Sequence, residues 1–243
     1  MRLIFIRHAE PDYDIDGLTP KGEREAGFLS ERVATWKVDH FYSSPLGRAK
    51  ATAAPSLQKL SQKAAVCEWL KEFYYPVTDP LTGRFGVPWD LMPEYFTKEP
   101  LFYDKDNWFR APLYRTNPEI ETGWRDVCNG LDRLLAGYGY SRDGACYKVT
   151  STADDPETGE PNLVFFCHLG VTCVMLAHLI GVSPVMLWQG TYLAPSSVTI
   201  VNAEKQMHDI AYFRIQALGN TAHLMAHDEP VSGYGAFSPV FHG

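Results

Sequence analysis

The feature that most constrains the fold is a short apolar run at the start of the chain, residues 3–6, which ends in Arg7 and His8. Branched and aromatic side chains in a run too short for a helix are typical of a buried β-strand. Buried strands of open α/β sheets present functional residues at their carboxyl ends. The run therefore predicts a strand that places a guanidinium, which can bind an oxyanion, beside an imidazole, which can attack a substrate or carry a proton.

The chain as a whole has an ordinary globular composition, with 45% hydrophobic and 21% charged residues. We expect one domain over residues 1–243. The formal charge of -7 argues against a nucleic-acid partner, although a local arginine pocket can still bind a small anion. No apolar run approaches the roughly 20 residues that span a bilayer, and the amino terminus lacks a signal-peptide pattern. These features predict a cytoplasmic protein without a membrane partner.

Cysteine and histidine spacing gives no sign of a metal site. The five cysteines are scattered and include no CxxC pair, which favours reduced thiols over disulfides or zinc binding. The tail adds His223, His227 and His242, but their spacing matches no metal-ligand pattern. We therefore expect neither a metal nor a cofactor.

A second strand-to-helix unit begins at residues 40–43, which we interpret as a strand. Ser44 should cap the helix that follows, Pro45 should open it, and Arg48 falls in its first turn. A cation at that position opposes the helix dipole, so Arg48 suggests an anion bound near the helix start.

A third unit is the clearest in the chain. Residues 162–167 are a fully apolar strand, followed by His168 and by an apolar helix over residues 171–180 that Gly181 closes. His168 thus lies between a buried strand and a helix N-terminus, which predicts an anion site. His178, inside that helix, is expected to be a packed or surface histidine.

The remaining patterns fill in the fold. They predict helices over residues 20–36 and 122–137, strands over residues 66–73, 147–150, 196–202 and 210–215, and a polar turn over residues 154–160. Within the stretch 66–73, Glu68 and Glu72 are both candidates for a proton donor, because a pocket that raises a carboxyl pKa makes it a general acid.

Residues 74–122 differ in character from the rest, being rich in aromatic residues and proline. Their hydrophobicity is too high for a disordered linker, and a long irregular segment of this kind is usually functional. We expect an insertion that folds over the strand ends and covers the site, with short helices near residues 90–97. Exposed aromatics in this insertion are also the candidate contact for a homodimer.

These units predict an α/β fold in three layers, with a mostly parallel central sheet, helices on both faces and an inserted lid region. Because parallel strands end at one edge of a sheet, Arg7, His8, Arg48 and His168 should meet there. Two imidazoles and two guanidinium groups suit a dianion. A histidine nitrogen can attack phosphorus, while arginines neutralise the oxygens of the transferring group.

This combination resembles the histidine phosphatase superfamily, also called the phosphoglycerate mutase-like family. Five segments carry the resemblance: residues 7–10 to its Arg-His-Gly signature, 18–22 to its first helix entry, 43–53 to its second-arginine segment, 70–72 to its acid-bearing segment, and 166–171 to its second-histidine segment. The likeness covers the first 73 residues well and residues 162–202 more loosely. It does not cover the insertion.

The resemblance implies a role for each matched residue. His8 would be the phosphorylated nucleophile. Arg7, Arg48 and His168 would bind the transferring phosphoryl group. Glu72 would be the general acid, because it fits the family's Leu-x-Glu pattern.

Departures from the family pattern bear on the activity. Ala9 replaces the usual glycine after the first histidine, and Leu169, which would line the substrate site, replaces a glycine that often follows the second. The loop over residues 11–17 lacks the asparagine-containing segment of the mutase-like members, and Tyr13 is the candidate to take its place. The missing segment and the insertion favour a phosphatase over a mutase, and the leading hypothesis is a metal-independent phosphatase of a small phosphorylated metabolite, acting through phosphohistidine. Ala9 and Leu169 keep a protein without catalytic activity open. A phosphomutase and a catalytically silent phospho-ligand binder are the alternatives.

Overall fold

The computed structural model describes residues 1–150, 160–207 and 209–241. Most of the predicted turn at residues 154–160, and His242, lie outside these ranges. Strands of the main sheet are β1 (Arg2–Arg7), β4 (His40–Ser43), β5 (Ala64–Val66), β8 (Tyr140–Asp143), β9 (Cys146–Val149), β10 (Asn162–Cys167), β11 (Val198–Met207) and β12 (Ile210–Asn220). They form one eight-stranded sheet in the order β5-β4-β10-β1-β11-β12-β9-β8.

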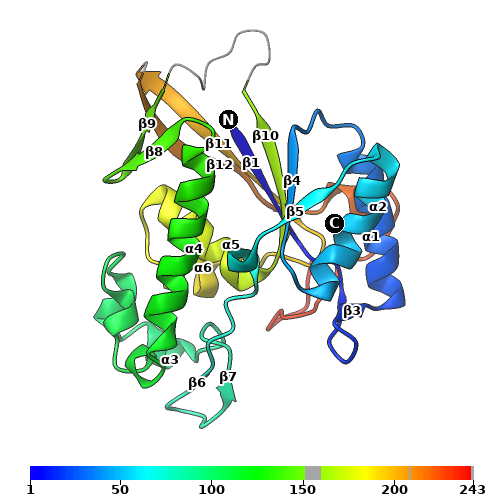
Figure 1. Cartoon of the computed structure of the whole chain (residues 1–243). Coiled ribbons are helices and arrows are strands. Elements are labelled where there is room, and N and C mark those ends of the chain that lie inside the picture. The colour runs from blue at the N-terminus through cyan, green and yellow to red at the C-terminus, as the bar shows by residue number, and fades with distance from the viewer. Residues whose placement is uncertain (151–159, 208, 242–243) are drawn as a thin grey trace.

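Helices cover both faces of this sheet (Figure 1). One face carries α1 (Pro20–Val33) and α2 (Gly47–Leu60), with α7 (Ala222–Met225) against α1. The other carries α4 (Glu119–Ala136), α5 (Leu169–Ile180) and α6 (Pro184–Gly190). Strand β1 contributes side chains to the apolar core on both faces of the sheet. Leu3 and Phe5 belong to one apolar cluster, and Ile4 and Ile6 belong to the other. This alternation is what a strand buried on both faces requires.

The α/β class and the helices on both faces are confirmed, while the balance of the sheet differs from the expectation. Strands β5, β4, β10 and β1 are parallel neighbours. From β1 onward the pairs β1–β11, β11–β12, β12–β9 and β9–β8 are antiparallel. The sheet is therefore mixed rather than mostly parallel, because β8 to β9 and β11 to β12 are joined as hairpins instead of through crossover helices.

Local sequence patterns place most elements correctly. Strands β4 and β10 have the predicted bounds, and α1 starts after Thr19, whose hydroxyl accepts the N–H of Gly22 as a helix cap. The predicted strand over residues 66–73 is wrong in its bounds. Strand β5 ends at Val66, and the chain then turns through the 3-10 segment Glu68–Leu70. Leu70 is fully buried, so tertiary packing overrides the alternating pattern there.

Residues 74–122 contain short elements instead of long ones. These are the hairpin β6 (Val77–Thr78) and β7 (Phe85–Gly86), helix α3 (Pro93–Phe96), and 3-10 turns at Pro100–Tyr103, Trp108–Arg110 and Tyr114–Thr116. Trp108 and Tyr114 are buried and their rings lie 5.4 Å apart. The segment is therefore joined to the main apolar core, and α3 falls within the predicted stretch 90–97.

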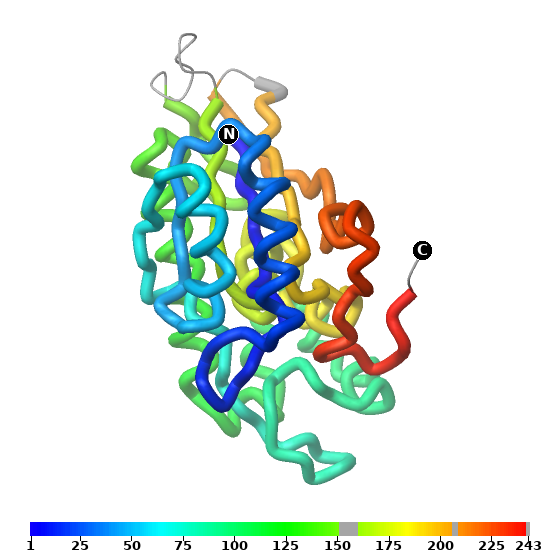
Figure 2. Tube along the Cα trace, turned by 90° about the vertical axis from the view of Figure 1, so that its right-hand side faces the viewer, coloured from blue at the N-terminus to red at the C-terminus, as the bar shows by residue number. Residues whose placement is uncertain are grey.

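Two further segments gather at the carboxyl edge of the parallel strands. One is the hairpin of β2 (Pro11–Asp12) and β3 (Gly17–Leu18), which follows β1. The other is the chain after α7, residues 229–241, called here the strap. Figure 2 shows the strap, in red, running down the side of the molecule toward the insertion at its foot and then turning back up toward the C-terminus. No helix among the described residues has both the length and the hydrophobicity to cross a membrane.

Candidate functional site

Strand pairing brings the two candidate histidines together. Strand β1 pairs in parallel with β10 through Arg7 opposite Cys167, and the N–H of His8 donates to the carbonyl of Cys167 at 2.9 Å. His168 follows directly. As a result the rings of His8 and His168 lie side by side, with 5.1 Å between their centroids. The expectation that these strand ends share one edge of the sheet is met in the structure.

The tautomer of His8 is set by its own backbone. Its Nδ1 lies 2.8 Å from the carbonyl oxygen of Ala9, which can only accept a hydrogen bond, so Nδ1 carries the proton. The lone pair is therefore on Nε2. Ala9 itself is fully buried and does not have a positive φ, so the missing glycine is tolerated without backbone strain.

His168 is held by Ser44, which the sequence pattern predicted to be a helix cap. Its Nε2 lies 2.7 Å from the hydroxyl of Ser44, while its buried Nδ1 has no hydrogen-bond partner within the described residues. Ser44 was expected to cap α2. Instead Leu46 occupies the cap position without a side-chain bond, and Ser44 accepts the N–H of Leu46 at 3.2 Å. Ser44 thus leaves the Nδ1 of His168 as the ring nitrogen that lacks a hydrogen-bond partner within the described residues.

Arg7 is buried beside these rings. Its Nη1 donates to the carbonyl of Leu193 at 2.5 Å, and its Nε has no partner among the described residues. The strap approaches from the other side at Gly235, where an added Cβ would lie 3.6 Å from Nη2 of Arg7. Gly235 has a φ of +83°, a conformation that favours glycine. Arg7 is therefore enclosed by two distant parts of the chain.

Arg48 is oriented by the hairpin loop after β2. Its Nη1 lies 2.6 Å from Oδ1 of Asp16, and Oδ2 of the same carboxylate accepts the N–H of Gly47 at 2.6 Å. The guanidinium also lies over the ring of Tyr13, 5.1 Å from its centroid. Tyr13 therefore lies next to the candidate anion site, where a substitute for the missing asparagine-containing segment is expected. The contact that it makes there is with Arg48.

Glu72 caps the helix that follows His168. Its Oε1 accepts the N–H of Val171 at 3.0 Å and its Oε2 accepts that of Gly170 at 3.2 Å, at the start of α5. The anion site expected at this helix N-terminus is therefore filled by a carboxylate of the chain itself. Burial raises the pKa of Glu72 above its usual range, although these N–H donors act in the opposite direction.

Burial also sets the charge of the two imidazoles. His8 is 1% and His168 0% exposed. Loss of solvation lowers the pKa of each ring well below its usual value, and the guanidinium groups of Arg7 and Arg48 lower it further. Both rings are therefore neutral at neutral pH, which is the state in which a histidine nitrogen is a nucleophile.

A cavity of about 1440 Å³ opens next to this cluster. Arg7, Arg48, Glu72, Tyr13 and Leu169 line it, together with residues of the insertion and of the strap. The two histidine rings are not part of the lining, but both are close enough to Arg7 and Arg48, which are, for those charges to lower their pKa values. All seven sequence-predicted site residues thus belong to one region of the structure.

Three contributors were missed by the sequence reasoning: Asp16, Ser44 and the strap. Asp16 and Ser44 act through contacts with residues 31 and 124 positions away. The strap lines the cavity although it lies at the far end of the chain. A local signal exists only for Gly235, a glycine that directly follows Tyr234 and lies two positions before Phe237. Among the described residues, no group of three or more His, Cys, Asp or Glu side chains could hold a metal ion.

Comparison with known proteins bears on both the motifs and the fold. Residues 3–84 match the profile of the histidine phosphatase superfamily (branch 1). None of the curated proteins matches the sequence. The sequence resemblance is thereby confirmed over the segment that contains Arg7, His8, Arg48 and Glu72.

Solved structures extend the likeness to nearly the whole chain. A phosphoserine phosphatase from Entamoeba histolytica, solved with 3-phosphoglyceric acid, is 19% identical, with a TM-score of 0.59 and coverage of 92% of this chain and 98% of that one. The α-ribazole phosphatase of Shigella flexneri is 17% identical, with a TM-score of 0.58 and coverage of 91% and 97%. A mycobacterial glucosyl-3-phosphoglycerate phosphatase, solved with inorganic phosphate, is 18% identical, with a TM-score of 0.55 and coverage of 91% and 98%. At these identities the likeness establishes a shared fold.

Proposed function

Because the chain carries the histidine phosphatase signature over residues 3–84 and shares that fold across its length, we propose that it is a metal-independent phosphatase of a small phosphorylated metabolite. One observation supports this most. A neutral His8, with its lone pair on Nε2, lies 5.1 Å from His168 and beside Arg7 and Arg48. This is the arrangement that a phosphohistidine mechanism needs.

In the first step the Nε2 of His8 attacks phosphorus and the bond to the leaving oxygen breaks. Arg7, Arg48 and the Nδ1 of His168 hold the phosphoryl oxygens, whose charge must be stabilised during transfer. Glu72 gives its proton to the leaving oxygen, a role that its raised pKa favours. In the second step water attacks the phosphohistidine, Glu72 takes back a proton, and the P–N bond breaks to release phosphate.

Purified protein should release phosphate from 4-nitrophenyl phosphate in the presence of EDTA. Substitution His8→Ala should abolish release, whereas His40→Ala, which removes an exposed histidine, should leave it unchanged. Activity that survives His8→Ala, or that disappears with EDTA, would contradict the proposal.

The alternatives are separated by the fate of the phosphoenzyme. Rapid loss of label after trapping with a radioactive substrate indicates a phosphatase, while a label that persists until an acceptor is added indicates a mutase. Tight phosphate binding with neither label nor turnover indicates a silent binder.

We further propose the cytoplasm as the compartment, since all five cysteines are free, as reducing conditions favour. A small phosphorylated molecule is the proposed partner. The homodimer stays a prediction, with light scattering as its test.

A further inference from the structure

The cavity beside the candidate site has room for much more than a phosphoryl group. Its volume of about 1440 Å³ exceeds the roughly 300–1,000 Å³ of common ligand sites. The groups assigned to phosphate lie at one end of the lining, on the strand ends and α2. The rest of the wall comes from the insertion and the strap. These two segments therefore select which alcohol part of a phosphate ester can bind.

The insertion contributes a fixed aromatic surface at Trp89. Its carbonyl accepts a hydrogen bond from Nε2 of Gln189 at 2.7 Å. Its indole packs onto the first turn of α5, where a Cβ at Gly170 would come within 2.4 Å of the ring. Phe96, on α3, lines the same wall. Because Trp89 is held at both its backbone and its ring, it is already in place before a ligand binds, which lowers the entropic cost of binding.

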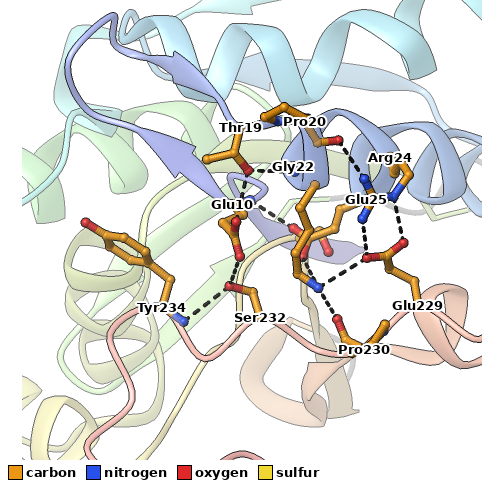
Figure 3. Close-up of polar contacts among 12 residues, drawn as sticks. Glu10, Thr19, Pro20, Gly22, Arg24, Glu25, Glu229, Pro230, Ser232 and Tyr234 are labelled. Atoms are coloured by element: carbon orange, nitrogen blue, oxygen red, sulfur yellow. Dashed lines mark hydrogen bonds and ion pairs between the residues drawn. The ribbon is translucent and has the colours of Figure 1, made fainter.

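The strap contributes a second part of the lining, and polar contacts hold it. Figure 3 shows Ser232 pointing at Glu10, with 2.6 Å between its hydroxyl and Oε2 of the carboxylate. The hydroxyl of Tyr192 donates to the carbonyl of Ser232 at 2.6 Å. Further back, Glu229 is paired with Lys21 and Arg24 of α1.

Beyond this anchorage the strap carries three aromatic residues into the cavity lining: Tyr234, Phe237 and Phe241. Their exposed fractions are 43%, 76% and 88%. The ring of Tyr234 lies 5.6 Å from that of Tyr13, next to Arg48. Aromatic rings that line one cavity and stay exposed, instead of packing into the core, indicate a surface available to a ligand.

Charges of the lining outside the phosphate end are already matched. Arg84 lies 3.6 Å from a carboxylate oxygen of Asp90, and Lys71 lies 2.6 Å from one of Glu68. A second anionic group on the leaving alcohol would therefore lose its hydration and find no unpaired cation there to bind. A planar, uncharged leaving group would instead bury apolar surface against rings on both sides.

We propose that the substrate is a phosphomonoester whose alcohol carries a large planar aromatic or heteroaromatic group, bound between Trp89 and the strap residue Phe237. This rests on the proposed function for the phosphoryl end of the site. It adds two specificity-determining residues that lie outside the family signature.

Three phosphates of primary alcohols test the proposal: 2-(2-naphthyl)ethyl phosphate, propyl phosphate and phosphoserine. Their leaving groups are all alkoxides, so differences in kcat/KM report mainly on binding of the alcohol. We expect the naphthyl ester to have a kcat/KM at least about tenfold above the other two, the equivalent of one good aromatic contact. Equal values, or a preference for phosphoserine, would overturn the proposal.

Variants locate the effect. Trp89→Ala and Phe237→Ala should each lower kcat/KM for the naphthyl ester about tenfold more than kcat/KM for propyl phosphate. Phe85→Ala is the matched control, because Phe85 is 66% exposed in the same insertion but does not line the cavity. An equal loss for both esters would show that these residues only support the fold.

The same question can be asked if no ester is turned over. Calorimetry with 2-(2-naphthyl)ethylphosphonate, which cannot be hydrolysed, then replaces kinetics. We expect the naphthyl phosphonate to bind at least about tenfold more tightly than propylphosphonate, and this preference to disappear in Phe237→Ala. That result would support the aromatic site even though the proposed catalytic activity had failed. Equal binding of the two phosphonates would reject the aromatic site by itself.

Discussion

Asp16 and Arg48 form an ion pair of 2.6 Å between the loop after β2 and the first turn of α2. The carboxylate also accepts the N–H of Gly47, so one side chain fixes both the arginine and the start of the helix that carries it. The Asp16 carboxylate thereby orients the guanidinium that we propose binds the phosphoryl group.

We predict that Asp16→Ala raises KM about tenfold with a smaller change in kcat, because a charge-assisted hydrogen bond of roughly 1.5–3 kcal/mol that orients Arg48 is lost. Asp16→Asn, which keeps a hydrogen-bond acceptor, should have a milder effect. Steady-state kinetics with 4-nitrophenyl phosphate would check both. Tighter phosphate binding by Asp16→Ala would instead mean that Asp16 competes with the substrate for Arg48.

The tautomer of His8 predicts where it is phosphorylated. Since Nδ1 donates to the carbonyl of Ala9, only Nε2 has a free lone pair. We expect trapped phosphoenzyme to contain phosphate on Nε2, detectable by the ³¹P–¹⁵N coupling of ¹⁵N-labelled protein. In the free protein the ring should stay neutral at pH 6, because burial and the nearby arginines lower its pKa well below the usual value. A phosphoryl group on Nδ1 would contradict the tautomer, and a ring charged at pH 6 would contradict the lowered pKa.

The sequence predicted those parts of the site that depend on strand ends. Arg7, His8 and His168 follow runs whose burial can be recognised locally, and parallel pairing of β1 with β10 then places them together. Arg48 was found through its position in a helix start. These residues needed no knowledge of distant contacts.

Roles that depend on long-range contacts escaped prediction. The sequence predicted that the N-termini of α2 and α5 would be free to bind an anion. In the structure their N–H groups are bound instead by the carboxylates of Asp16 and Glu72, which lie 31 and 98 positions away. Ser44 has the local pattern of a helix cap but bonds to His168 instead. The antiparallel half of the sheet was underestimated for the same reason, since pairing of β12 with β9 depends on tertiary contacts and not on local propensity.

Glu72 should be needed most where the leaving group is poorest. We predict that Glu72→Gln lowers kcat about 10²-fold or more for propyl phosphate, because an alkoxide must be protonated as it leaves. The loss for 4-nitrophenyl phosphate, whose leaving group is a weak base, should be much smaller. Glu68→Gln is the control, since the Glu68 side chain is 73% exposed. An equal loss for both esters would assign Glu72 to helix capping only.

A buried carboxyl group behind the site should make stability depend on pH. Glu25, on α1, is 0% exposed; its Oε2 accepts the N–H of Glu10 and its Oε1 lies 3.6 Å from Nζ of Lys21. Glu10 and Glu229 add negative charge nearby. Burial, the largest cause, raises the pKa of Glu25 to about 7, from 4.5 in an exposed state.

Between pH 4.5 and 7 the folded protein thus holds a proton that the unfolded chain has lost, so this contribution to stability is present at low pH and disappears as the pH rises through 7. The shift corresponds to a loss of roughly 2–3 kcal/mol between pH 5 and pH 8. Glu25→Gln, which cannot ionise, should escape that loss and gain stability relative to the parent protein by this amount over the same interval. Urea unfolding at the two pH values measures it, with Glu23→Gln, an exposed glutamate on the same helix, as the control. A difference between Glu25→Gln and the parent that does not change with pH would show that Glu25 is ionised in the folded protein throughout this range.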